Sequence, residues 1–320
     1  MATAARTPAL PSGSDTATGG LSLRGEVWRQ LRRDRLASAS LVVLALLFVT
    51  ALLGKLLTEG IVVFDPTLVR LPDKLLPPLA GAGAGLATDQ LPAFGRYLLG
   101  TDDLGRDVFA RMLQGSFVSL SIGFVAVSIE LAIGVLLGGL AGFYGGRIDT
   151  LIMRFTDVML CFPTFFLILT VVALLPPSIW NIMIVIGATS WMGTCRFVRA
   201  ELLSLREQDF VRAARALGLS DARIIFRHMV PNAIAPVLVS ATIAVASAIL
   251  TESGLSYLGF GVQAPNASWG NILADGRLFL FDAPWLFAIP GVAILVVVLA
   301  LNLVGEGLRD ALNPRLRRGA

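Results

Sequence analysis

The sequence is poor in charged residues and in the residues that most often bind metals. Only 15% of its 320 residues are charged, whereas an ordinary soluble domain has roughly 25%. It contains a single histidine, His228, and two cysteines, Cys161 and Cys195, which stand in apolar surroundings. These residues are too few for a disulfide framework, and their spacing is not that of a metal site. We therefore expect no metal or other cofactor in this chain.

Motifs of nucleotide-binding and hydrolytic enzymes are also missing. The sequence contains no G-x-x-x-x-G-K-[ST] loop, no H-E-x-x-H and no G-x-S-x-G. Without the first motif, the chain has no backbone cradle of that kind for the phosphates of ATP. The chain is therefore predicted not to be an enzyme.

Apolar residues, in contrast, are abundant and form long uncharged runs. Hydrophobic residues make up 55% of the chain, and the mean hydropathy is +0.77. Several runs approach the roughly 20 residues that a helix needs to cross the hydrocarbon core of a membrane. We predict an all-α integral membrane protein with about six transmembrane helices, at residues 36–53, 115–144, 158–175, 178–195, 229–251 and 283–305.

Prolines divide the longest uncharged stretch, residues 158–195. Pro176 and Pro177 stand near its middle. A continuous helix passes through two prolines only with difficulty, because each removes a hydrogen-bond donor and clashes one turn back. The stretch is therefore predicted to be a helical hairpin, with a kink at Pro163 in its first arm.

The remaining segments divide the chain into five parts. Residues 1–22 are predicted to be a disordered cytoplasmic tail, and residues 23–57 to combine an amphipathic surface segment with the first transmembrane helix. Residues 58–111 are predicted to form an extracytoplasmic loop. The rest of the chain is divided into a core of five transmembrane helices at 112–310, which includes a long connection at 204–231, and a cytoplasmic tail at 311–320.

Arginines cluster in the N-terminal segment, in the long connection and near the C-terminus. With six spans, these three regions share one side of the membrane. The positive-inside rule places that side in the cytoplasm. We therefore expect a multi-pass protein of the plasma (inner) membrane, in contact with lipid, with both termini in the cytoplasm.

Two kinds of residue stand out within the predicted spans. Gly134, Gly138 and Gly142 recur at a spacing of four, so they share one helix face and would let another helix approach closely. Glu130 and Glu252 are carboxylates in apolar surroundings, where an unpartnered charge costs about 2.5–3.5 kcal/mol on insertion scales. Each could line a translocation path or be a hydrogen-bonded structural group. For Glu130 we expect the structural role.

The long connection is patterned like two short helices. Phe210, Ala213, Ala214 and Leu217 recur at helical spacing and predict a helix with one apolar face. Gly218 follows and suits the left-handed position that ends many helices.

A second helix is predicted to follow the first. Ser220 can cap its N-terminus, and it would run through Ile224 and Ile225 toward Pro231 at the membrane. An exposed apolar helix face needs a partner, which could be lipid, a cytoplasmic protein, or nucleic acid read by a helix–turn–helix. Nucleic acid is disfavoured, because membrane spans bracket the segment closely.

The coupling loop of ABC importer permeases resembles residues 210–232 of this chain, FVRAARALGLSDARIIFRHMVPN. The family pattern is Glu-Ala-Ala, three residues, Gly, nine residues and Ile-x-Leu-Pro. Ala213, Ala214, Gly218 and Pro231 fall on it. The stretches at 100–113, 142–158 and 255–273 resemble the C-type permease of the dipeptide/oligopeptide subfamily.

This resemblance implies a type I importer permease fold. The chain would be the permease subunit of an ATP-driven, binding-protein-dependent importer of dipeptides or oligopeptides. The alternative is that the same machinery imports nickel or another small solute. The implied partners are a second, B-type permease, an extracytoplasmic substrate-binding protein, and one or two ABC ATPases that bind ATP and Mg²⁺. The residues implied in coupling to the ATPase are Phe210, Arg212, Ala213, Ala214, Arg215, Leu217, Gly218 and Pro231.

Two questions stay open at this point. An ion-coupled secondary transporter would use Glu130 and Glu252 as coupling carboxylates and would need no ATP. Within the loop, Arg212 stands where the family has glutamate, and His228 and Val230 replace Ile and Leu. Arg212 is either solvent-exposed, so that its charge hardly matters, or matched by an acidic residue of the ATPase. The other arginines of the loop favour an acidic partner.

Overall fold

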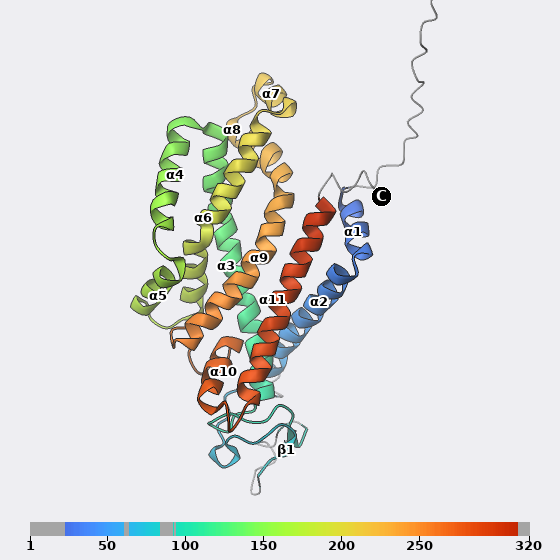
Figure 1. The fold of residues 1–320 in the computed structure, drawn as a ribbon, viewed down its shortest axis with the longest axis vertical. Coiled ribbons are helices and arrows are strands. Elements are labelled where there is room, and N and C mark those ends of the chain that lie inside the picture. The colour runs from blue at the N-terminus through green and yellow to red at the C-terminus, as the bar shows by residue number, and fades with distance from the viewer. Residues whose placement is uncertain (1–22, 61–63, 84–91, 93, 313–320) are drawn as a thin grey trace, which may run out of the picture.

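The chain folds into long helices, with a small two-stranded sheet at one end of the molecule (Figure 1). The structure is a computed structural model that describes residues 23–60, 64–83, 92 and 94–312. The predicted N-terminal tail and most of the predicted C-terminal tail lie outside the described residues.

The first two helices lie at the predicted amphipathic segment and first span. α1 covers Leu23–Arg33 and α2 covers Arg35–Lys55, which continues into the π-helical η1, Leu56–Gly60. Asp34 separates the two helices, and its Oδ1 accepts hydrogen bonds from the N–H groups of the next turn, at 2.9 and 3.2 Å. The carboxylate thus satisfies donors that have no partner within α2.

The loop between α2 and α3 has little regular structure in its described parts. The 3₁₀ turn η2 spans Leu71–Asp73. Strand β1, Ala80–Gly81, pairs antiparallel with β2, Arg96–Tyr97.

Four helices follow in the centre of the chain. They are α3, Val108–Tyr144, α4, Gly146–Leu160, α5, Thr164–Leu174, and α6, Ile179–Arg206. The outer loop ends earlier than the predicted residue 111, because Asp107 caps α3 by accepting a hydrogen bond from the Phe109 N–H group (2.8 Å). With its 37 residues, α3 is about 55 Å long.

The irregularity predicted at Pro163 is present, but it is a break between two helices and not a kink in one helix over 158–175. α4 and α5 meet at an angle of 80° across a short break. Pro163 lies in this break as the N-cap residue of α5, and it has no N–H group with which to continue α4. The predicted hairpin is present, since Pro176 and Pro177 lie between α5 and α6.

The C-terminal part contains the long connection and two further long helices. The second helix of the connection does not stop near Pro231, because α8, η4 and α9 follow one another without a break. This helix is therefore the beginning of the fifth predicted span. The elements are α7, Asp209–Ala216, α8, Asp221–Arg223, the π-helical η4, Ile224–Met229, α9, Val230–Tyr257, α10, Trp269–Gly276, the 3₁₀ turn η5, Arg277–Phe279, and α11, Trp285–Leu312.

Within the described residues, four helical stretches are long and apolar enough to cross a membrane: α2 with η1, α3, the part of α9 from Pro236, and α11. The bent pair α4–α5 would be a fifth span. α6 is long enough at 28 residues but does not qualify, since polar and charged residues interrupt it. The predicted total of about six is reached only if the bent pair and α6 also cross.

α3 and α6 pack closely through three glycines of α3. A Cβ atom added at Gly134, Gly138 or Gly142 would lie under 3.0 Å from an atom of α6. Small residues are needed wherever two helix backbones approach so closely. The structure thus places the glycine face predicted from the sequence against α6.

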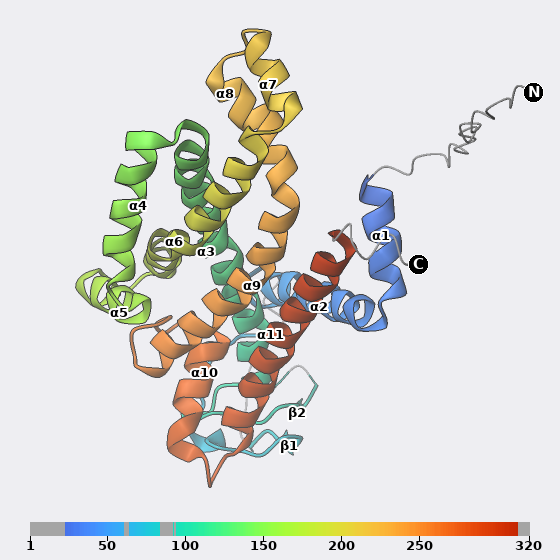
Figure 2. The same ribbon diagram turned by 45° about the horizontal axis from the view of Figure 1, so that its top comes forward.

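The helix ends with clustered arginines lie toward one end of the molecule. Figures 1 and 2 show α1, α7, α8 and the C-terminal end of α11 at that end, with α10 and the two strands at the other. Within the described residues, which include only Arg309 of the C-terminal arginines, this arrangement agrees with the assumption that the arginine-rich regions share one side of the membrane.

We predict that Gly138→Ala destabilises the protein and that the neighbouring Gly139→Ala does not. An added Cβ at Gly138 would collide with the backbone oxygen of Cys195, whereas at Gly139 its nearest neighbours lie at 3.7 Å. Overpacking of this kind costs about 1–3 kcal/mol, while both changes bring the same gain in helix propensity. Thermal unfolding of the two purified variants in one detergent measures the difference. Equal midpoints would contradict the assigned close contact.

Candidate functional site

α7 presents one face to its own chain and another to solvent. Val211 and Ala214 are 0% and 6% exposed, and they pack in a cluster with residues of α3, α6, η4 and α9. Phe210 and Leu217 are 38% and 81% exposed, and Ala213 is also exposed. The predicted apolar stripe is divided between two faces. Phe210, Ala213 and Leu217 are exposed, whereas Ala214 belongs to the buried face. Val211, which the sequence analysis did not single out, is buried beside it.

Gly218 ends α7 in the left-handed conformation predicted for it, with φ = 73°. Its N–H group donates to the carbonyl oxygen of Arg215 (2.9 Å), and the Leu219 N–H group donates to that of Ala214 (3.2 Å). Ser220 occupies the N-cap position of α8, as predicted, but its side chain accepts no capping hydrogen bond. The turn is thus closed by backbone groups.

Arg212 is solvent-exposed and forms an ion pair within its own chain. Its Nη2 lies 3.3 Å from Glu207 Oε2, and both side chains are more than 60% exposed. Hydrogen bonds from Arg212 and Arg206 lower the pKa of Glu207. Exposed pairs of this type contribute little to stability, so the Arg212 guanidinium is available to a partner.

The other two residues predicted for coupling occupy different places. The Arg215 guanidinium lies 4.9 Å from the centre of the Phe143 ring, at the end of α3, and such a contact is attractive. Pro231 stands exposed in the first turn of α9, beyond η4. The exposed part of α7 therefore unites Phe210, Arg212, Ala213 and Leu217, with Pro231 on another element.

Glu130 makes a hydrogen bond to a neighbouring helix and also lines a cavity. It is 9% exposed, and its Oε1 accepts a hydrogen bond from the Thr194 hydroxyl of α6 (2.7 Å). It also lines a cavity of about 350 Å³ formed by α3, α4, α5, α6 and α9. The carboxylate is thus hydrogen-bonded and faces an open space between helices.

Glu252, by contrast, is fully buried at the contact between α9 and α10. Its Oε1 accepts hydrogen bonds from the hydroxyl groups of Ser256 (2.7 Å) and Ser268 (2.8 Å). Ser268 is also the N-cap residue of α10, where it accepts a hydrogen bond from the Asn271 N–H group. Oε2 of Glu252 is buried and has no hydrogen-bond partner among the described residues. Glu252 does not line the cavity beside Glu130.

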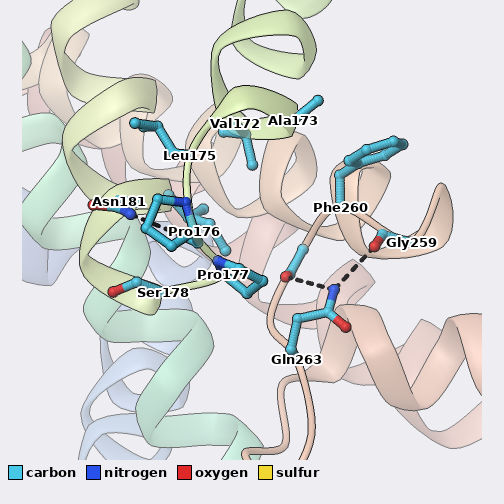
Figure 3. Close-up of a pocket in the computed structure, with 12 residues that line it drawn as sticks. Val172, Ala173, Leu175, Pro176, Pro177, Ser178, Asn181, Gly259, Phe260 and Gln263 are labelled. Carbon is cyan, nitrogen blue, oxygen red and sulfur yellow. Dashed lines mark hydrogen bonds between the residues drawn. The ribbon is translucent and has the colours of Figure 1, made fainter.

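A second cavity of about 350 Å³ lies where the α5–α6 hairpin meets the loop after α9 (Figure 3). The side-chain amides of Asn181 and Gln263, which line it, donate hydrogen bonds to backbone carbonyl groups of the surrounding loops. Asn181 Nδ2 donates to the Pro176 carbonyl oxygen (2.8 Å), and Gln263 Nε2 donates to those of Gly259 (2.9 Å) and Gly261 (3.2 Å). With these amide donors engaged, Pro176, Phe260 and their apolar neighbours dominate the lining.

The polar residues that share the first cavity with Glu130 were not predicted from the sequence. Ser190, Ser247 and Thr251 all line it, together with Gly193. Ser247 and Thr251 stand four residues apart in an otherwise apolar run of α9. This spacing puts both on one helix face, and together with Glu130 it is the indication of the cavity that the sequence offers.

An ionic network at the other end of the molecule was also missed. Asp102 Oδ2 accepts hydrogen bonds from Arg106 (2.7 Å) and Arg111 (2.6 Å), and Arg111 also lies 3.2 Å from Asp275 Oδ2 in α10. Burial raises the pKa of the Asp275 carboxyl, although Arg111 opposes the shift. The network fixes the outer loop and the start of α3 against α10.

The fold and these features define a helical membrane protein with a cavity between its helices and an exposed helix–turn–helix at its arginine-rich end. Residues 134–318 match the family described as "Binding-protein-dependent transport system inner membrane component", and residues 22–78 match the "N-terminal TM domain of oligopeptide transport permease C". The chain belongs to the first of these families, the inner-membrane permeases of binding-protein-dependent transport systems, as the resemblance in the sequence implied.

Relatives match along nearly the whole chain. The dipeptide transport system permease protein DppC of Alkalihalophilus pseudofirmus is 39% identical over 91% of this chain and 90% of its own length. The oligopeptide transport system permease protein OppC of Bacillus subtilis is 36% identical over 93% and 92%. The solved MetNI methionine ABC transporter, in an inward-facing conformation, has a chain with the same fold, at a TM-score of 0.50, 18% identity, and coverage of 64% of this chain and 98% of that one.

We predict that Gly218→Val loosens the α7 turn and that Gly218→Asn leaves it closed. No atom lies within 4 Å of an added Cβ, so the only penalty is the left-handed backbone, which asparagine tolerates better than a β-branched residue. For valine the strain is on the order of 1 kcal/mol or more. Hydrogen–deuterium exchange of the α7 amides measures the effect, and faster exchange is expected for valine alone. The same exchange rates in both variants would refute this role for Gly218.

Proposed function

We propose that this chain is the permease subunit of an ATP-driven, binding-protein-dependent importer of dipeptides or oligopeptides. The similarity to permeases named for dipeptide and oligopeptide transport, over more than 90% of the chain, carries the proposal. The cavity beside Glu130 supports it, since a transported solute needs a space between the helices.

In this proposal α7 docks on a partner ATPase, which holds ATP and Mg²⁺. Phe210, Ala213 and Leu217 supply exposed apolar area, and Arg212 adds a positive charge suited to an acidic groove. Because Val211 and Ala214 are buried against α3 and α6, a displacement of α7 is carried to helices that line the cavity. ATP binding would thereby change the access to the cavity.

The remaining partners fit the two ends and the open side of the molecule. A second permease subunit would cover the cavity and complete the translocation path. The arginine-rich end with α1 and α7 faces the cytoplasm by the positive-inside rule. A substrate-binding protein would then dock at the opposite end, near α10 and the two strands (Figure 1).

We predict that Leu217→Asp abolishes most ATP-dependent peptide uptake and releases the ATPase from the complex. The change removes an apolar contact worth roughly 1.5–3 kcal/mol when buried and places a carboxylate in the interface. Uptake of a labelled dipeptide into proteoliposomes that contain the chain and its native partners is measured with and without ATP, alongside co-purification of the ATPase.

Leu71→Asp is the matched control, because Leu71 is 64% exposed at the opposite end of the molecule. It should leave co-purification of the ATPase unchanged. Uptake by the unmodified complex that does not depend on ATP would contradict the proposed function. Normal co-purification of Leu217→Asp would contradict the role of α7.

A further inference from the structure

The cavity beside Glu130 contains one charged group and several hydroxyl groups. Its lining residues come from α3, α4, α5, α6 and α9. Gly193 and Ser247 are exposed in the isolated chain, so the cavity opens at the surface of this subunit. The residues that line it are Glu130, Leu160, Thr164, Ile186, Ser190, Met192, Gly193, Ala244, Ser247, Ala248 and Thr251.

Only one of the two carboxylate oxygens of Glu130 accepts a hydrogen bond from a described residue. Oε1 accepts the Thr194 hydroxyl proton (2.7 Å). Oε2 has no hydrogen-bond partner in the described part of the chain, yet it is not fully buried, so it faces the cavity. A carboxylate oxygen in such a place is a strong acceptor for a charged donor.

The nearest cations of α6 are already paired with carboxylates of α4. Arg196 Nη2 lies 2.5 Å from Asp157 Oδ1, and Arg199 forms a bidentate pair with Asp149. Among the described residues, no Lys, Arg or His lies within ion-pair distance of Glu130. An ionised Glu130 therefore has no countercharge within ion-pair distance in the described part of the chain.

The hydroxyl groups of the cavity add acceptors at its wall. Within residues 94–312, the side chains of Thr164, Ser190 and Ser247 form no hydrogen bond to another group. One carboxylate oxygen and several free hydroxyl oxygens match the three N–H donors of a primary ammonium group.

We propose that this cavity is a subsite for a primary ammonium group of the transported solute, held by Glu130. The inference rests on the proposed peptide-import function and names the chemistry that the permease itself recognises. The ammonium comes either from the N-terminus of a peptide or from a lysine side chain. Both sources present the same three donors, and the experiment separates them.

The test compares uptake of Ala-Ala with uptake of N-acetyl-Ala-Ala by the reconstituted complex, and expresses the result as a ratio. The binding protein also selects solutes, but it is the same in every variant. A change of the ratio between permease variants therefore reports the permease alone. Glu130→Gln retains the volume and the acceptor for Thr194 while removing the charge, and it is expected to lower the ratio about tenfold.

Two further variants complete the design. Glu130→Asp keeps the charge and should retain most of the preference for the free amine. Glu306→Gln makes the same charge change at an exposed position of α11, and the ratio should stay at the unmodified value. Co-purification of the ATPase verifies the assembly of each variant.

N-acetyl-Lys-Ala distinguishes the source of the ammonium group. Sensitivity of its uptake to Glu130→Gln assigns the subsite to lysine side chains, and sensitivity of Ala-Ala alone assigns it to the peptide N-terminus. Ratios that do not change for any peptide in Glu130→Gln would overturn the inference while leaving the import function intact. A complex that imports none of the peptides with ATP would contradict the import function itself.

Discussion

The close approach of α3 and α6 is the contact on which the rest of the structure depends. Three glycines let the two backbones meet, and the same contact brings Thr194 of α6 to the carboxylate of Glu130 on α3. Toward the arginine-rich end, the pair continues into the cluster that buries Val211 of α7. A larger residue at the glycine face would therefore disturb the cavity and the attachment of α7 together, because both are built on one helix pair.

This arrangement gives the proposed coupling a physical path. α7 is short, so its position is fixed by what it packs on rather than by its own helical stability. Val211 and Ala214 lie on the cluster formed by α3, α6 and η4, and Arg215 lies over the Phe143 ring. η4 continues into α9, which contributes Ser247 and Thr251 to the cavity. A force applied to the exposed side of α7 thus reaches the cavity through packed side chains and through a continuous helix.

Much of the fold could be predicted from the sequence, because apolar length, prolines and glycines act locally. The first span, the hairpin at Pro176 and Pro177, the glycine face and the left-handed Gly218 follow from such rules. Pro163 marked the place of the bend between α4 and α5, but it did not indicate that the helix ends there and the chain turns by 80°, since a proline can either kink or end a helix and neighbouring helices decide which. The cavity beside Glu130 could not be predicted, because it requires the relative placement of five helices. Val211 was missed because the 3.6-residue pattern in α7 fits both an inner and an outer face.

The proposed coupling requires that α7 and the helices on which it packs move together when a partner ATPase binds ATP. The most direct test is a distance measurement between spin labels at Ala213→Cys on α7 and Arg147→Cys on α4, both at exposed positions, in a background where the exposed Cys161 is replaced by serine. The complex of the chain with its proposed permease and ATPase partners is measured without nucleotide and with ATP trapped. The account predicts the same distance distribution in both states, because α4 is joined to α6 through Arg199 and Asp149 and α7 through the buried cluster. A distribution that shifts on ATP binding would show α7 swinging independently and would contradict the account.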